Sequence, residues 1–109
     1  MPRFVILRHE VPVAYGRPSH WDFMLEQADD LLTWSLLELP GPGQSVPAEP
    51  LPAHRKLYLD YRGPVSGGRG EVQPWDAGRF EGLQHEEQQV VVRLQGQQLQ
   101  GIVWLVTPP

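Results

Sequence analysis

The sequence contains no cysteine, a single lysine (Lys56) and no long hydrophobic run. Without cysteine there is no disulfide, no thiolate metal ligand and no cysteine nucleophile, so any metal must be held by histidine, carboxylate, carbonyl or water. No apolar stretch approaches the roughly 20 residues that span a bilayer, and the apolar run at residues 4–7 is too short for a signal peptide. We therefore expect a soluble, cytoplasmic protein.

Positive charge is also scarce. Nine Lys and Arg residues stand against 13 Asp and Glu, which gives a formal net charge of -4. This balance argues against a protein that coats long nucleic acid through many phosphate contacts. Because eight of the nine basic residues are arginine, the better bidentate phosphate partner, a single phosphate or one strand end remains a plausible ligand.

Turn-forming residues are abundant, with 12 Pro and 11 Gly in 109 residues. They separate short apolar or alternating segments at intervals of roughly 8–12 residues, and no segment has the pattern of an amphipathic helix. The expected strands are 4–7, 20–26, 31–39, 54–61, 71–75 and 79–83, followed by a hairpin of 90–94 and 98–106. This pattern predicts one all-β domain over residues 1–109, either a sandwich or, more simply, a small closed or partly open β-barrel of about eight strands with long Pro/Gly-rich loops.

Three segments are expected to lie outside the strands. Residues 40–53 hold five prolines, which lack the amide donor that a ladder needs, so we expect an irregular connection there. Residues 63–70 form a glycine-rich loop without the lysine and spacing of a phosphate-binding P-loop. Asp76, Ala77 and Gly78 predict a turn between two short strands.

The segment from His20 to Glu26 carries the strongest functional signal. Read as a strand, it places Trp21, Phe23 and Leu25 on one face, and His20, Asp22, Met24 and Glu26 on the other. A strand that buries one face and offers imidazole and carboxylate on the other is a rigid support for a site. The alternative is an ordinary half-buried strand with polar residues facing water.

Three of the four histidines lie where predicted strands begin or end. His9 follows the first strand, and His20 and His54 each begin a later one. If these strand ends converge, two histidines and Asp22 would form a three-ligand site with open positions, suited to Mn²⁺ or Zn²⁺. The alternative is that the histidines are separate structural or surface residues; His85, beside two glutamates, is expected to be solvated.

Taken together, these features resemble the 3′-phosphoesterase domain at the N-terminus of bacterial DNA ligase D, which also occurs as a stand-alone protein. The resemblance runs nearly end to end, and its most specific part is the block from His20 to Glu26. The other matching elements are Phe4-Val5-Ile6 with His9, then Trp34, His54 with Tyr58, residues 75–78, and the glycines and aliphatic residues of the terminal hairpin with Trp104.

The resemblance implies a β-barrel and a Mn²⁺-dependent activity, with Zn²⁺ or another divalent metal as alternatives. That activity removes a 3′-terminal ribonucleotide, and then the remaining 3′-phosphate, during DNA repair. By position, His9, Asp22 and His54 would bind the metal, while His20 and Tyr58 would contact the scissile phosphate or transfer protons. The implied partners are a nucleic-acid 3′ end or a small phosphoester and a repair ligase or polymerase in trans, and we expect a monomer.

Two positions depart from the family pattern. Met24 stands where the family has arginine, and Glu38 stands where it usually has lysine. Both changes remove positive charge near the expected phosphate site, which favours a second hypothesis: a non-catalytic module that binds DNA ends or a repair protein. A third is a structural barrel without metal. The basic residues that could compensate are Arg8, Arg17, Arg55, Lys56, Arg62 and Arg69.

Overall fold

The computed structural model describes residues 1–109 and is all-β, as the turn-rich sequence predicts. Nine strands form one mixed sheet, with no α-helix, and no helical segment is both long and apolar enough to cross a membrane. The strands are β1 (Arg3–Glu10), β2 (His20–Glu26), β3 (Leu31–Leu36), β4 (Ser45–Pro47), β5 (Glu49–His54), β6 (Gly63–Pro64), β7 (Glu71–His85), β8 (Gln89–Gly96) and β9 (Gln100–Val106). Two single 3₁₀ turns, η1 (Val13–Tyr15) and η2 (Lys56–Leu59), complete the fold.

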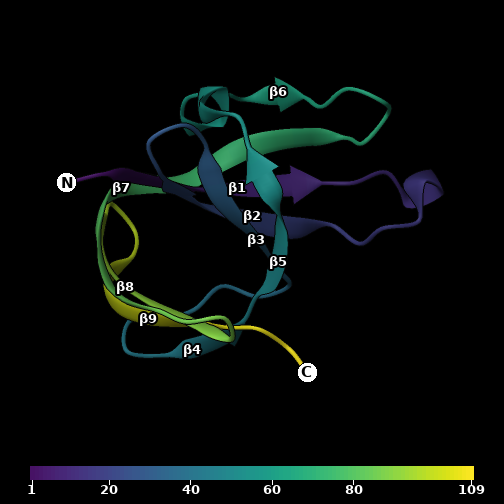
Figure 1. Cartoon of the computed structure of the whole chain (residues 1–109). Helices are drawn as coiled ribbons and strands as arrows, with labels where there is room; N and C mark the ends of the chain where they lie inside the picture. The colour runs from purple at the N-terminus through teal and green to yellow at the C-terminus, as the bar shows by residue number, and fades with distance from the viewer.

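The sheet curls strongly, as Figure 1 shows, but it is not closed into a barrel. Its strand order is β4-β9-β8-β7-β1-β2-β3-β5, with β6 paired to β7. The two end strands, β4 and β5, are separated in sequence only by Ala48, yet they do not pair with each other. Proline explains the open edges, because Pro47 in β4 and Pro50 and Pro52 in β5 offer no amide to a further ladder. Of the two forms expected from the sequence, a closed or a partly open barrel, the closed one is therefore wrong.

Several predicted segments need correction. Residues 40–53 are not irregular throughout, because they contain β4, parallel to β9, and most of β5, antiparallel to β3. The prolines there are tolerated because both strands lie at sheet edges. Residues 54–61 are not a strand: His54 ends β5 and η2 follows, which turns the buried side chain of Leu59 towards the sheet.

Residues 76–78 do not form a turn, since they lie inside the continuous 15-residue strand β7. The carboxylate of Asp76 accepts backbone N–H bonds from Ala77 and from Gln97, Gln98 and Leu99 at the β8–β9 connection, so its hydrogen-bonding capacity is satisfied without a local turn. Gly78 is where β7 changes partner from β1 to β8. A Cβ at Gly78 would lie 2.0 Å from the carbonyl oxygen of Gln95, so close strand approach, not turn geometry, requires glycine there.

The sheet buries apolar side chains on both faces. The larger core contains Phe23 and Leu25 of β2, with Trp21 packed against it, which confirms the predicted apolar face of this strand. The opposite face of β2 does not simply face water, because Met24 belongs to a second cluster with Val5, Leu7, Leu31, Leu59 and Val72. The polar half of the strand, with His20 and Asp22, is also buried. The carboxylate of Asp22 is thus held away from solvent, next to an apolar cluster of side chains.

Candidate metal centre

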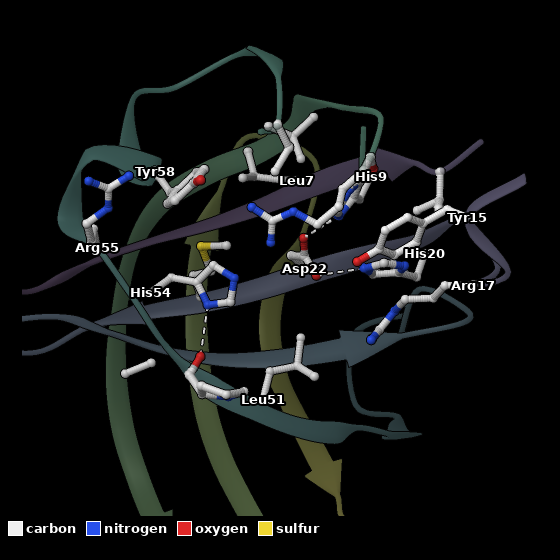
Figure 2. Close-up of a pocket in the computed structure, with 17 residues that line it drawn as sticks. Leu7, His9, Tyr15, Arg17, His20, Asp22, Leu51, His54, Arg55 and Tyr58 are labelled. Atoms are coloured by element: carbon white, nitrogen blue, oxygen red, sulfur yellow. Dashed lines mark hydrogen bonds and ion pairs between the residues drawn. The ribbon is translucent and has the colours of Figure 1, made fainter. Parts of the chain in front are cut away.

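A cavity of about 450 Å³ lies over this second face and brings together all five residues singled out from the sequence. His9 comes from β1, His20 and Asp22 from β2, His54 from the end of β5, and Tyr58 from η2. In Figure 2, Asp22 lies near the centre, with His9 and His20 on one side and His54 and Tyr58 on the other. Residues from four separate elements therefore line the same cavity.

The pairing of β1 with β2 creates the closest group. His9 lies directly opposite His20 in the antiparallel register, and Asp22 follows His20 on the same face of β2. His9 Nδ1 is 3.1 Å from Asp22 Oδ2, and His20 Nε2 is 3.0 Å from Asp22 Oδ1. The ligand atoms of these three residues all lie within 4.8 Å of one another, whereas His54 lies outside this group.

The far nitrogens of the two histidines are held by backbone carbonyls. His9 Nε2 lies 2.8 Å from the carbonyl oxygen of Arg69, and His20 Nδ1 lies 2.9 Å from that of Pro18. A carbonyl oxygen only accepts hydrogen bonds, so these nitrogens carry the protons and donate them. In a neutral ring the nitrogen that faces Asp22 is then unprotonated and presents its lone pair to the carboxylate.

While both rings are neutral, this arrangement leaves the Asp22 carboxylate facing two acceptors. Asp22 Oδ1 is buried and has no hydrogen-bond partner, although His20 Nε2 lies only 3.0 Å away. Lone pairs facing a carboxylate repel one another unless the rings bind extra protons or a cation lies between them. A buried orphan oxygen with two converging imidazoles is therefore an observation that fits a metal ion.

The electrostatics of the metal-free site agree with this interpretation. The contact with Asp22 is the main cause that raises the pKa of His9 above its usual value. Burial works to raise the pKa of Asp22, but the contacts with His20 and His9 prevail and lower it from 3.8 to about 2. Asp22 is thus an anion at neutral pH, and it draws positive charge into the site.

His54 is oriented by the same kind of local hydrogen bond as His20. Its Nδ1 donates to the carbonyl oxygen of Pro52 at 2.9 Å, two residues earlier, just as His20 donates to Pro18. The ring of Tyr58 packs edge-on against His54, with centroids 5.7 Å apart. The Pro-x-His spacing occurs at both histidines, and it is a sequence signal that could have indicated oriented imidazoles before the structure was known.

Other features of the cavity were not evident from the sequence. The ring of Tyr15, from η1, lies beside His20 on the cavity wall (Figure 2). Of the six basic residues considered as compensating cations, three line the cavity, namely Arg17, Arg55 and Arg69. Met24 also lines it but is 1% exposed and packs in the apolar cluster, so β2 itself contributes no cation.

Comparison with known families agrees with this description. The chain matches the DNA ligase D 3′-phosphoesterase domain over residues 9–107 of its 109. The chain therefore belongs to that family. A search of curated proteins finds no match.

Proposed function

We propose that this protein is a divalent-metal-dependent phosphoesterase that acts on DNA 3′ ends bearing a terminal ribonucleotide or a 3′-phosphate. The observation that carries the proposal is the buried His9–His20–Asp22 group with the unpartnered Oδ1 of Asp22. Family membership over residues 9–107 supports the reaction class. We propose Mn²⁺ as the ion because the family resemblance implies it and the Asp22 carboxylate suits it. Zn²⁺, which imidazole suits, is the competitor to test.

Asp22 and His9 are the two ligands on which the proposal depends most. Asp22 is an anion held in a desolvated position, and His9 is oriented by the Arg69 carbonyl, which leaves its Nδ1 for the metal. When bound, the ion would neutralise phosphate charge and orient the phosphoester.

Two histidines compete for the role of third nitrogen ligand. The expectation from family resemblance is His54, with His20 contacting phosphate, while the compact geometry favours His20. Whichever imidazole is not a ligand remains beside the site with one nitrogen held by a carbonyl and the other free to exchange a proton with a phosphate or leaving oxygen. Tyr58, on the cavity wall beside His54, is proposed to donate its hydroxyl proton to a phosphate oxygen.

A second candidate function, binding of DNA ends or a repair partner without hydrolysis, is favoured by a specific observation. Met24 is buried among aliphatic side chains, and Glu38 lines a second cavity that also includes His20. β2 therefore offers no positive charge that would attract phosphate, and the negative charge of Glu38 lies in a neighbouring cavity. Such a protein would still bind metal and 3′ ends but would not turn them over.

The test uses purified protein with Mn²⁺ and two primer–template duplexes, one ending in a 3′-phosphate and one in a single 3′-ribonucleotide. Release of phosphate or of the terminal nucleoside, abolished by His9→Ala, is the expected result. The matched control is His85→Ala, because His85 is exposed and lies outside the cavity. Metal binding and end binding without product from either primer would reject the enzyme and favour the second candidate.

A further inference from the structure

The anion-binding part of the site must come from somewhere other than β2. A phosphate ester beside Asp22 would meet a carboxylate, so it needs fixed positive charge in addition to any metal. The cavity wall offers three guanidinium groups, those of Arg17, Arg55 and Arg69. Only Arg69 has side-chain hydrogen bonds, whereas the guanidinium groups of Arg17 and Arg55 have none.

Arg69 is already engaged. Its Nε donates to the carbonyl oxygen of Ser66 at 2.7 Å and its Nη2 to the Ser66 hydroxyl at 3.1 Å. These bonds shape the loop whose Arg69 carbonyl orients His9. Arg69 therefore serves the site through its backbone, and its guanidinium donors are partly used.

Arg17, like Arg55, forms no ion pair or side-chain hydrogen bond, but of the two it is Arg17 whose charge acts on His9. It lines both the main cavity and a second cavity of about 520 Å³, and His20 is the other residue common to the two. Its positive charge opposes the rise in the pKa of His9, so its field reaches the ligand group. Figure 2 places it beside Tyr15 and His20, on the opposite side of the cavity from Arg55.

The segment that carries Arg17 is anchored at both ends. Ser19 Oγ accepts the backbone N–H of Val11 at 2.9 Å, and the N–H of Gly16 closes η1 on the carbonyl of Val13 at 3.1 Å. Pro18, next to Arg17, provides the carbonyl that orients His20. The position of Arg17 is therefore linked to that of the His20 ring through Pro18 alone.

Besides Arg17, the second cavity has two carboxylates in its lining. Glu38 and Glu49 line it, and neither forms an ion pair with Arg17. These carboxylates repel a phosphate. In the main cavity the single carboxylate of Asp22 is opposed by three guanidinium groups, so an anion drawn by Arg17 is directed to that side.

We infer that Arg17 is the phosphate-binding residue of this protein, the guanidinium that holds the phosphoryl group of the substrate at the His20 side of the metal centre. The inference deepens the proposed function and rests on it for the substrate class. Arg17 is assigned a binding role, so its loss raises KM for a phosphoester more than it lowers kcat.

The experiment measures binding of inorganic phosphate by calorimetry, with and without saturating Mn²⁺, to the wild type and to Arg17→Gln, Arg17→Lys and Arg55→Gln. Arg62→Gln is the matched control, since Arg62 is exposed, unpaired and outside both cavities. Arg17→Gln is expected to weaken phosphate binding on the order of 10- to 100-fold, as for loss of a charge-assisted hydrogen bond. Arg17→Lys restores part of the affinity, and the Mn²⁺-induced rise in Tm of Arg17→Gln matches the wild type.

Three results would overturn the inference: wild-type phosphate affinity in Arg17→Gln, a larger loss in Arg55→Gln, or no phosphate binding by the wild type in either condition. The proposed function fails separately. If phosphate binding depends on Arg17 but Mn²⁺ neither binds nor supports turnover, the anion site stands and the metal-dependent phosphoesterase does not.

Discussion

Asp22 links metal binding to the stability of the fold, and this link yields the most direct prediction. Asp22 is 4% exposed, and its Oδ1 has no hydrogen-bond partner. A cation that binds between Asp22 and the two imidazoles supplies the missing partner and binds only the folded chain. Mn²⁺ should therefore stabilise the wild type, and Asp22→Asn, which removes the anion but keeps the shape, should remove most of the effect.

The magnitude follows from linkage. At a free Mn²⁺ concentration of about 100 times Kd, binding adds about 2.7 kcal/mol to the free energy of unfolding. For a domain of this size, each kcal/mol raises Tm by roughly 4 °C. The expected increase for the wild type is thus about 10 °C.

The pH dependence separates metal binding from simple protonation. In the metal-free protein, the raised pKa of His9 means that its stabilising contribution is complete below about pH 6.5 and is lost as pH rises through the folded-state pKa. The lowered pKa of Asp22 gives a contribution that is present above about pH 3.8 and is lost as pH falls towards about 2. The Tm of the metal-free protein should therefore fall from pH 6 to 8, while the increase caused by Mn²⁺ should grow, because the ion competes with protons for the imidazoles.

The assay is thermal unfolding at pH 6, 7 and 8, with chelator or with Mn²⁺. Asp29→Asn is the control, since Asp29 is an exposed carboxylate that does not line the cavity. The reasoning is refuted if Mn²⁺ leaves the wild-type Tm unchanged, if Asp22→Asn responds as the wild type does, or if the increase shrinks as pH rises.

Three further predictions concern individual residues. Of His20→Ala and His54→Ala, the one that removes the third ligand should weaken Mn²⁺ binding at least about tenfold in calorimetry, while the other should lower turnover with metal affinity retained. Wild-type metal affinity in both variants would leave neither histidine as a ligand. Asp76→Ala removes the acceptor of four backbone N–H bonds and should cost about 3–5 kcal/mol in urea unfolding, and a loss below about 1 kcal/mol would contradict its role in the β8–β9 connection. Gly70 lies at φ +93°, and a Cβ added there would lie 1.8 Å from the Glu10 carbonyl oxygen. Gly70→Ala should therefore cost about 2–4 kcal/mol by the same measurement and, by displacing Arg69, weaken Mn²⁺ binding. Wild-type stability would contradict the close approach.

Local pattern was sufficient for the parts of the fold that alternate or end in clear turns. The two faces of β2 and the terminal hairpin were predicted because side-chain alternation and turn residues act over a few positions. Local pattern was wrong at 54–61, where the sequence of a 3₁₀ turn alternates like that of a strand. It was also wrong at Asp76, since three of its four partners are more than 20 residues away. The prolines of β5 also misled it, because only strand order reveals which strands lie at an edge.

By itself, the sequence determined the chemistry available to this protein: imidazole and carboxylate ligands without thiols, few cations, and a strand with an apolar face and a site face. Only the tertiary structure decided which of those groups meet. The β1–β2 register sets His9 opposite His20, the carbonyls of Pro18 and Arg69 orient the rings, and the loop after β1 brings Arg17 to the cavity. The physical reason is that ligand geometry depends on distances of a few ångströms between elements remote in sequence, and strand pairing and burial set those distances.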